Sequence, residues 1–97
     1  MEIQVISDSE LAVTGHIKTI DDYLKIKGSL SGLLEKGINS LSIKVIDSVS
    51  IPSSLIGYLL KIVLENKKEI RILVKDERLF GLLETLNLVD VLKVKKI

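Results

Sequence analysis

Three hydroxyls gather around the only proline of the chain, Pro52, just before a strongly apolar stretch begins. They belong to Ser50, Ser53 and Ser54. Proline holds φ near the helical value and has no N–H, so it suits the start of a helix. The first N–H groups of a helix lack intrahelical partners and carry the positive pole of its dipole. The serines can therefore cap this helix, or one of them can carry a phosphate in a favourable field.

The other reactive side chains do not form a catalytic pattern. His16 is the only histidine, and a general base or a metal ligand needs partners. Asp21 and Asp22 are neighbours in a predicted helix and point in different directions, so compensation of the helix dipole explains them better than catalysis. The chain has no cysteine, which excludes disulfides and thiolate chemistry. We therefore expect no enzyme, with no catalytic residue, no cofactor and no metal.

Alternating strands and helices must position the serines. Apolar residues predict five strands, at residues 3–6, 11–14, 41–46, 70–74 and 91–94. Spacings of three and four residues predict three helices, at residues 19–36, 53–64 and 76–86. Thr19 is the expected cap of the first helix, Gly37 its stop, and Asn87 the left-handed residue after the third.

This order predicts a single domain, residues 1–97, of the α/β class. The first two strands form a hairpin, and the helices between later strands imply right-handed parallel crossovers. The result is a mixed sheet of about five strands with helices, in the order β-β-α-β-α-β-α-β. The nearly continuous apolar run at 70–74 predicts a central strand covered on both faces. Gly28 and Gly32 share a helix face, which fits either a close backbone approach or a weak helix.

Composition limits the classes of partner. The formal net charge is +1, so charge gives no reason to expect direct binding of nucleic acid. No apolar run approaches the ~20 residues of a membrane helix, and the first residues do not resemble a signal peptide. We expect a cytoplasmic protein without membrane insertion. The sequence does not decide between a monomer and a homodimer. The second helix is so apolar that Ile56 or Leu60 is expected to stay accessible to a partner.

Three segments resemble motifs of a known family. They are Gly15-His16-Ile17, Pro52-Ser53-Ser54-Leu55-Ile56-Gly57 and Leu83-Glu84-Thr85-Leu86-Asn87-Leu88. With these segments the chain resembles, over nearly its whole length, the STAS domain of bacterial anti-sigma factor antagonists. Members carry a loop of roughly Asp-Ser-Ser-Gly-Leu-Gly at the start of an apolar helix. This chain has Pro52 in place of the Asp, Leu55 in place of the first Gly, and Asn87 in place of a later Gly.

The resemblance implies a regulatory protein-binding module. Such domains bind an anti-sigma factor that is also a serine kinase, and phosphorylation of one serine at the helix start breaks the complex. Matched residue by residue, that serine is Ser54, with Ser53 before it. We expect a partner to contact the serine loop, defined here as Ser50, Pro52, Ser53, Ser54, Leu55 and Gly57. The alternative is a STAS scaffold that is not phosphorylated, such as a stressosome-like core or an accessory subunit of a transporter.

Overall fold

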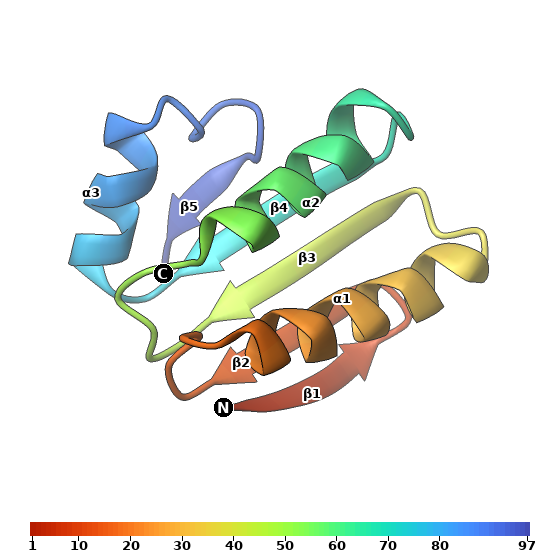
Figure 1. The fold of residues 1–97 in the computed structure, drawn as a ribbon. Coiled ribbons are helices and arrows are strands. Elements are labelled where there is room, and N and C mark those ends of the chain that lie inside the picture. Colours follow the sequence, from red (N-terminus) through yellow and green to blue (C-terminus); the bar gives the residue numbers. More distant parts are fainter.

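A mixed five-stranded sheet forms the framework of the protein, in a computed structural model that describes all residues 1–97 (Figure 1). Its strands lie in sequence order and are β1 (Glu2–Ser7), β2 (Glu10–Thr14), β3 (Ser40–Val45), β4 (Glu69–Val74) and β5 (Val94–Lys96). The helices are α1 (Ile20–Glu35), α2 (Ser53–Leu64) and α3 (Glu77–Thr85). β1 is antiparallel to β2, and every other neighbouring pair is parallel. The predicted α/β class, element order and mixed sheet are confirmed.

The helices cover only one face of the sheet, with α1 and α2 lying across it side by side (Figure 1). Alternate side chains of β3 and β4 are buried on this face: Leu41, Ile43, Val45, Ile70, Ile72 and Val74. They join one aliphatic cluster with the inner sides of the helices. On the opposite face Arg71 is exposed and Leu73 is only half-buried. The prediction that β4 is covered on both faces is therefore wrong, because Arg71 and Leu73 belong to a face that no helix covers.

Charged side chains line this open face of the sheet. The Glu69 carboxylate lies 3.1 Å from the Arg71 guanidinium and 3.3 Å from the Lys93 ammonium. Lys44 and Glu10 form a second pair at 3.3 Å across β3 and β2. Such exposed pairs contribute little stability each, about 0–1 kcal/mol. Their main consequence is that the uncovered face is polar and well solvated.

The expected helix ends are present. Thr19 caps α1 in a reciprocal capping box with Asp22. Gly37 and Asn87 follow α1 and α3 with φ of 84° and 58°, the left-handed conformation that ends many helices. Gly28 and Gly32 are exposed, and a Cβ atom at either position would meet nothing within 4 Å. The alternative of a close backbone approach at these glycines is therefore wrong.

The last strand lies later in the chain than predicted. The predicted fifth strand is present and pairs with β4, but its predicted bounds of 91–94 are wrong, because β5 begins only at Val94. The N–H groups of Leu92 and Val94 instead donate to the carbonyls of Leu88 and Val89, which are turn hydrogen bonds. Leu92 is completely buried and anchors this turn in the core. An apolar residue that anchors a turn produces the same sequence signal as one in a short strand.

Both chain termini lie on the same side of the sheet, next to the carboxyl ends of β2, β3 and β4 (Figure 1). Glu2 pairs with Thr14, the last residue of β2. The N–H of Ile97 donates to the carbonyl of Val74, the last residue of β4, at 2.8 Å. None of the three helices combines the length and the apolar character needed to cross a membrane.

Candidate functional site

The serine loop lies at the carboxyl ends of the parallel strands and comprises residues that follow β3 and the first residues of α2. The carboxyl ends of the strands are where α/β sheets commonly place their binding residues. As expected, α2 begins at the serines: Pro52 is the N-cap, and Ser53 and Ser54 are the first two helical residues. Both serine side chains are exposed. The loop therefore presents two adjacent hydroxyls to solvent at the start of a helix that packs one side on the core.

Neither hydroxyl caps the helix. The structure has no side-chain hydrogen bond at the N-cap of α2, so the capping interpretation of these serines is wrong. The physical reason is position: a capping oxygen must come from the N-cap residue, and here that residue is Pro52. The first helical bonds run from the N–H groups of Leu55 and Ile56 to the Pro52 carbonyl, at 3.0 and 3.2 Å. The preceding N–H groups, on Ser53 and Ser54, have no partner within the chain.

The start of α2 differs electrostatically from the other two helix starts. α1 has Asp21 and Asp22 in its first turn, and α3 has Glu77 there beside its Asp76 cap. The first turn of α2 has no acidic residue. Because carboxylates near a helix N-terminus offset its dipole, only α2 keeps this positive end uncompensated.

At each of these two starts, hydrogen bonds favour the ionised form of one carboxylate, Asp76 at α3 and Asp22 at α1. The Arg78 side chain donates to Asp76, and the N–H groups of Arg78 and Leu79 donate to it as well. These bonds lower the pKa of Asp76 from 3.8 to about 2. At α1, the N–H groups of Lys18 and Thr19 donate to Asp22 and hold its pKa below its ordinary value.

Two residues before the serine loop tie it to the segment that follows β2. The Asp47 carboxylate accepts the N–H of Gly15 at 2.7 Å. The Ser48 hydroxyl accepts the N–H of Ile17 at 3.0 Å and donates to the carbonyl of Ser50 at 2.7 Å. Ser48 is 1% exposed and is the only buried polar residue of the chain. It therefore holds the serine loop and the Gly15 segment together as one surface.

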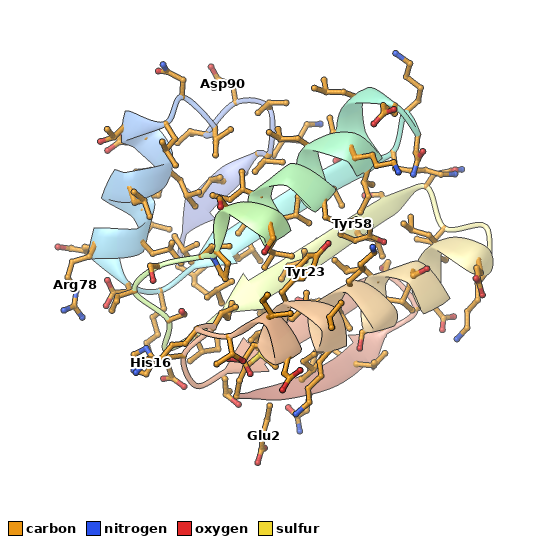
Figure 2. All side chains as sticks on the ribbon, viewed as in Figure 1. Glu2, His16, Tyr23, Tyr58, Arg78 and Asp90 are labelled. Atoms are coloured by element: carbon orange, nitrogen blue, oxygen red, sulfur yellow. The ribbon has the colours of Figure 1, made fainter.

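The loop is continuous with the seam between α1 and α2. The ammonium of Lys27 on α1 lies 5.4 Å from the centre of the Tyr58 ring on α2 and 5.9 Å from that of Tyr23. Figure 2 shows both tyrosines between the two helices. Tyr58 is four residues after Ser54 and so on the same side of α2. Ser54 is therefore on the side of α2 that faces α1.

Exposed apolar side chains lie on the first turns of α1, beside this seam. Ile20 is 73% exposed and Leu24 is 51% exposed. The prediction that Ile56 or Leu60 of α2 stays accessible is only partly met, because both are half-buried against the core cluster. Sequence reasoning assigned the accessible apolar surface to the middle of α2, whereas the exposed large apolar side chains include Ile20 and Leu24 of α1, two residues of β1, and only Leu64 of α2. The sequence does contain a signal for this surface on α1: Ile20 and Leu24 are four residues apart, on the side of the helix away from its core-facing residues.

The members of the serine loop differ in what they offer a partner. Ser50 and Gly57 are exposed, like the serine pair, and Pro52 is half-buried. Leu55 is only 3% exposed and packs in the core. Its side chain is therefore not available to a partner, and it adds no bulk to the surface next to Ser54.

The site is an open surface and not a pocket. The protein has three hollows, and none is lined by a residue of the serine loop. His16 is exposed after Gly15, and no three His, Asp or Glu side chains come together in a group that could hold a metal ion. What the arrangement can do chemically is present a hydroxyl, and unpaired N–H groups, to a macromolecule. Comparisons with protein-family models, with curated proteins and with solved structures find no match.

Proposed function

We propose that the protein is a cytoplasmic regulatory module of the STAS type, which binds an anti-sigma factor with serine kinase activity and is switched by phosphorylation of Ser54. One observation carries this proposal. The Ser54 hydroxyl is exposed, takes no part in capping, and stands at the only helix start without a compensating carboxylate. A kinase would reach it without unfolding the domain.

The chemistry of the switch follows from charge. A phosphoserine adds about 1.5 to 2 negative charges at neutral pH. In the free protein, the unpaired N–H groups and the dipole of α2 would stabilise this charge. In a complex, the same charge would be buried against a partner that packs on Ile20 and Leu24, and burying it costs binding energy. Phosphorylation would therefore weaken the complex and leave the fold intact.

The surface around Ser54 supports protein binding more than small-molecule binding. Ile20 and Leu24 are exposed at the start of α1, shortly after the segment that Ser48 ties to the serine loop, and neither they nor the loop line a pocket. Apolar side chains surrounded by polar ones mark many protein interfaces. Because Leu55 is turned into the core, its difference from the family's Gly places no side chain in the path of a kinase.

The test uses the serine kinases encoded in the same genome. Each is incubated with the protein and ATP, and phosphate is mapped by mass spectrometry. We expect phosphate on Ser54, which disappears in Ser54→Ala and persists in Ser53→Ala. Ser54→Asp is expected to weaken binding of the cognate kinase at least tenfold, which equals about 1.4 kcal/mol. Ser9→Asp, in the exposed turn between β1 and β2, is the matched control and should bind like the wild type.

Two outcomes would contradict the proposal. One is the absence of phosphate on Ser54 with every kinase tested. The other is Ser54→Asp binding as tightly as Ser9→Asp.

Pro52 favours a second candidate function, a STAS scaffold that is not phosphorylated. Where the family has a carboxylate next to its phosphorylated serine, the N-cap here is a proline with no polar side chain. A scaffold would recover no kinase in a pull-down, but only copies of itself or a transporter ATPase. In that case Ser54→Asp and Ser9→Asp should assemble equally well.

A further inference from the structure

The two edges of the sheet are protected to different degrees. β5 has only three residues, and Lys95 and Lys96 are exposed on it. Short, lysine-rich edge strands resist pairing with other chains. β1 has six residues without lysine or proline, and its Val5 and Ile6 are 59% and 52% exposed. The β1 edge is therefore open to a further strand.

Hydrogen bonding on β2 identifies which of its residues face which neighbour. The carbonyls of Ser9 and Val13 accept N–H groups from the β3 side. Successive residues of a strand direct their N–H and C=O groups to opposite edges. Ala12 and Thr14 therefore face β1.

The register between the two strands then assigns the free edge of β1. Gln4 lies opposite Ala12, and Glu2 lies opposite Thr14. Gln4 and Glu2 are thus the residues bonded to β2. Ile3 and Val5, which alternate with them, direct their N–H and C=O groups outward to the open edge.

We propose that β1 pairs with the β1 strand of a second copy of this chain, antiparallel, about a twofold axis at Gln4. Ile3 of each copy then lies opposite Val5 of the other, and each such pair exchanges two N–H···O bonds. A pairing centred on Val5 would run into the irregularity between Val5 and Ser7. The pairing centred on Gln4 is therefore the one that uses both outward-facing residues of the regular part of β1, and it joins the two sheets into one.

The side chains of β1 suit a second copy. Ile3 and Val5 lie opposite Val13 and Leu11, which are buried, so both point to the helix-covered face. Glu2 is the only charged residue of the strand. In this register the two Glu2 carboxylates lie beyond the Ile3–Val5 pairs, at opposite ends of the interface. No like charges face each other across the axis.

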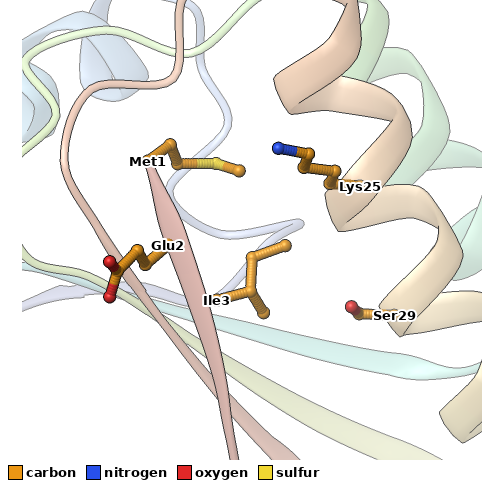
Figure 3. Close-up of a pocket in the computed structure, with 5 residues that line it drawn as sticks. All are labelled: Met1, Glu2, Ile3, Lys25 and Ser29. Carbon is orange, nitrogen blue, oxygen red and sulfur yellow. The ribbon is translucent and has the colours of Figure 1, made fainter.

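A hollow beside β1 would receive the second copy. It measures about 450 Å³ between β1 and α1 and is lined by Met1, Glu2, Ile3, Lys25 and Ser29. Figure 3 shows the Ile3 side chain pointing to the α1 side of the strand, while Glu2 points away. The Val5 side chain of the second copy would lie against Ile3 at this hollow. The pairing would thus cover the apolar side chains of Ile3 and Val5 as well as satisfy backbone groups.

Single cysteines test the register cleanly, because the chain has none of its own. At Gln4, on the axis, the two Cβ atoms would be about 4.5–5.5 Å apart, close to disulfide geometry. Glu2 shares the edge and the outer face, but its two copies would be four positions apart, about 14 Å. We expect Gln4→Cys to become a covalent dimer under mild oxidation and Glu2→Cys to stay monomeric. No cross-link at Gln4, or equal cross-linking at both positions, would overturn the proposal.

A second pair of variants tests the interface without a cross-link. Val5→Pro removes an outward N–H and no bond to β2, whereas Val5→Ile keeps that N–H. In sedimentation velocity at high protein concentration, the wild type and Val5→Ile should show the mass of two chains. Val5→Pro should show the mass of one chain, with an unchanged circular dichroism spectrum. A wild type that stays at the mass of one chain, or a dimer that persists in Val5→Pro, would overturn the proposal.

Discussion

Replacing Ser48 by alanine tests whether one buried hydroxyl holds the candidate site together. The substitution removes the acceptor for the Ile17 N–H and the donor to the Ser50 carbonyl. Ile17 is 2% exposed, so water does not readily replace the lost partner. An unsatisfied buried donor costs about 1–3 kcal/mol. We expect the free energy of unfolding to fall by about 2 kcal/mol, which in a domain of this size lowers the melting temperature by about 10 °C.

The assay is thermal and urea unfolding followed by circular dichroism, with hydrogen exchange of the Ile17 amide measured by NMR. Ser50→Ala is the matched control, because Ser50 contributes its backbone carbonyl and its side chain is exposed. That control should stay within about 0.5 kcal/mol of the wild type. The Ile17 amide should exchange faster only in Ser48→Ala. Equal stability of the two variants would refute the assignment of Ser48 as the link between the two segments.

Three further predictions concern backbone and charge. Gly28→Ala should raise the free energy of unfolding by about 0.5–1 kcal/mol in urea titrations, because its Cβ meets nothing within 4 Å; a loss of stability would contradict the open space there. Gly15→Ala should lower it by at least about 1–2 kcal/mol, because φ is +79° and the Cβ would lie 2.9 Å from Met1 Cα; an unchanged urea midpoint would argue against this strained turn. Asp76→Asn should lower the melting temperature at pH 7, and this difference should shrink as the pH falls through 4 toward 2. The sign follows because the folded pKa of Asp76, about 2, lies below its ordinary value of 3.8, so its charge stabilises the fold only where it is ionised; a gap independent of pH would disprove it.

The fold could be predicted to a large extent, because the spacing of apolar residues that distinguishes strands from helices is visible within short stretches of the sequence. Thr19, Gly37 and Asn87 marked helix ends through capping and left-handed geometry that depend on a few neighbouring residues. The coverage of β4 could not be predicted in this way. Leu73 makes the strand look apolar on both sides, although only the side of Ile72 meets helices.

In the candidate site, too, features that depend on neighbouring residues could be predicted, whereas features that depend on contacts distant in the sequence could not. The start of α2 at Ser53 could be predicted, because proline marks a helix start through its own geometry. Ser48 could not be singled out, because its role depends on the N–H of Ile17, which is 31 residues earlier in the chain. The absence of a serine cap on α2 depended on a shift of one position, since the N-cap is Pro52 and not a serine.

The position of the two chain ends has a practical consequence for any binding experiment. Met1 and Ile97 both emerge beside the edge that carries the serine loop. An affinity tag or fluorescent protein fused to either end would stand next to that loop and shield it sterically. A label at the exposed turn after α2, around Lys67, would lie at the opposite end of the strands and leave the serine loop free.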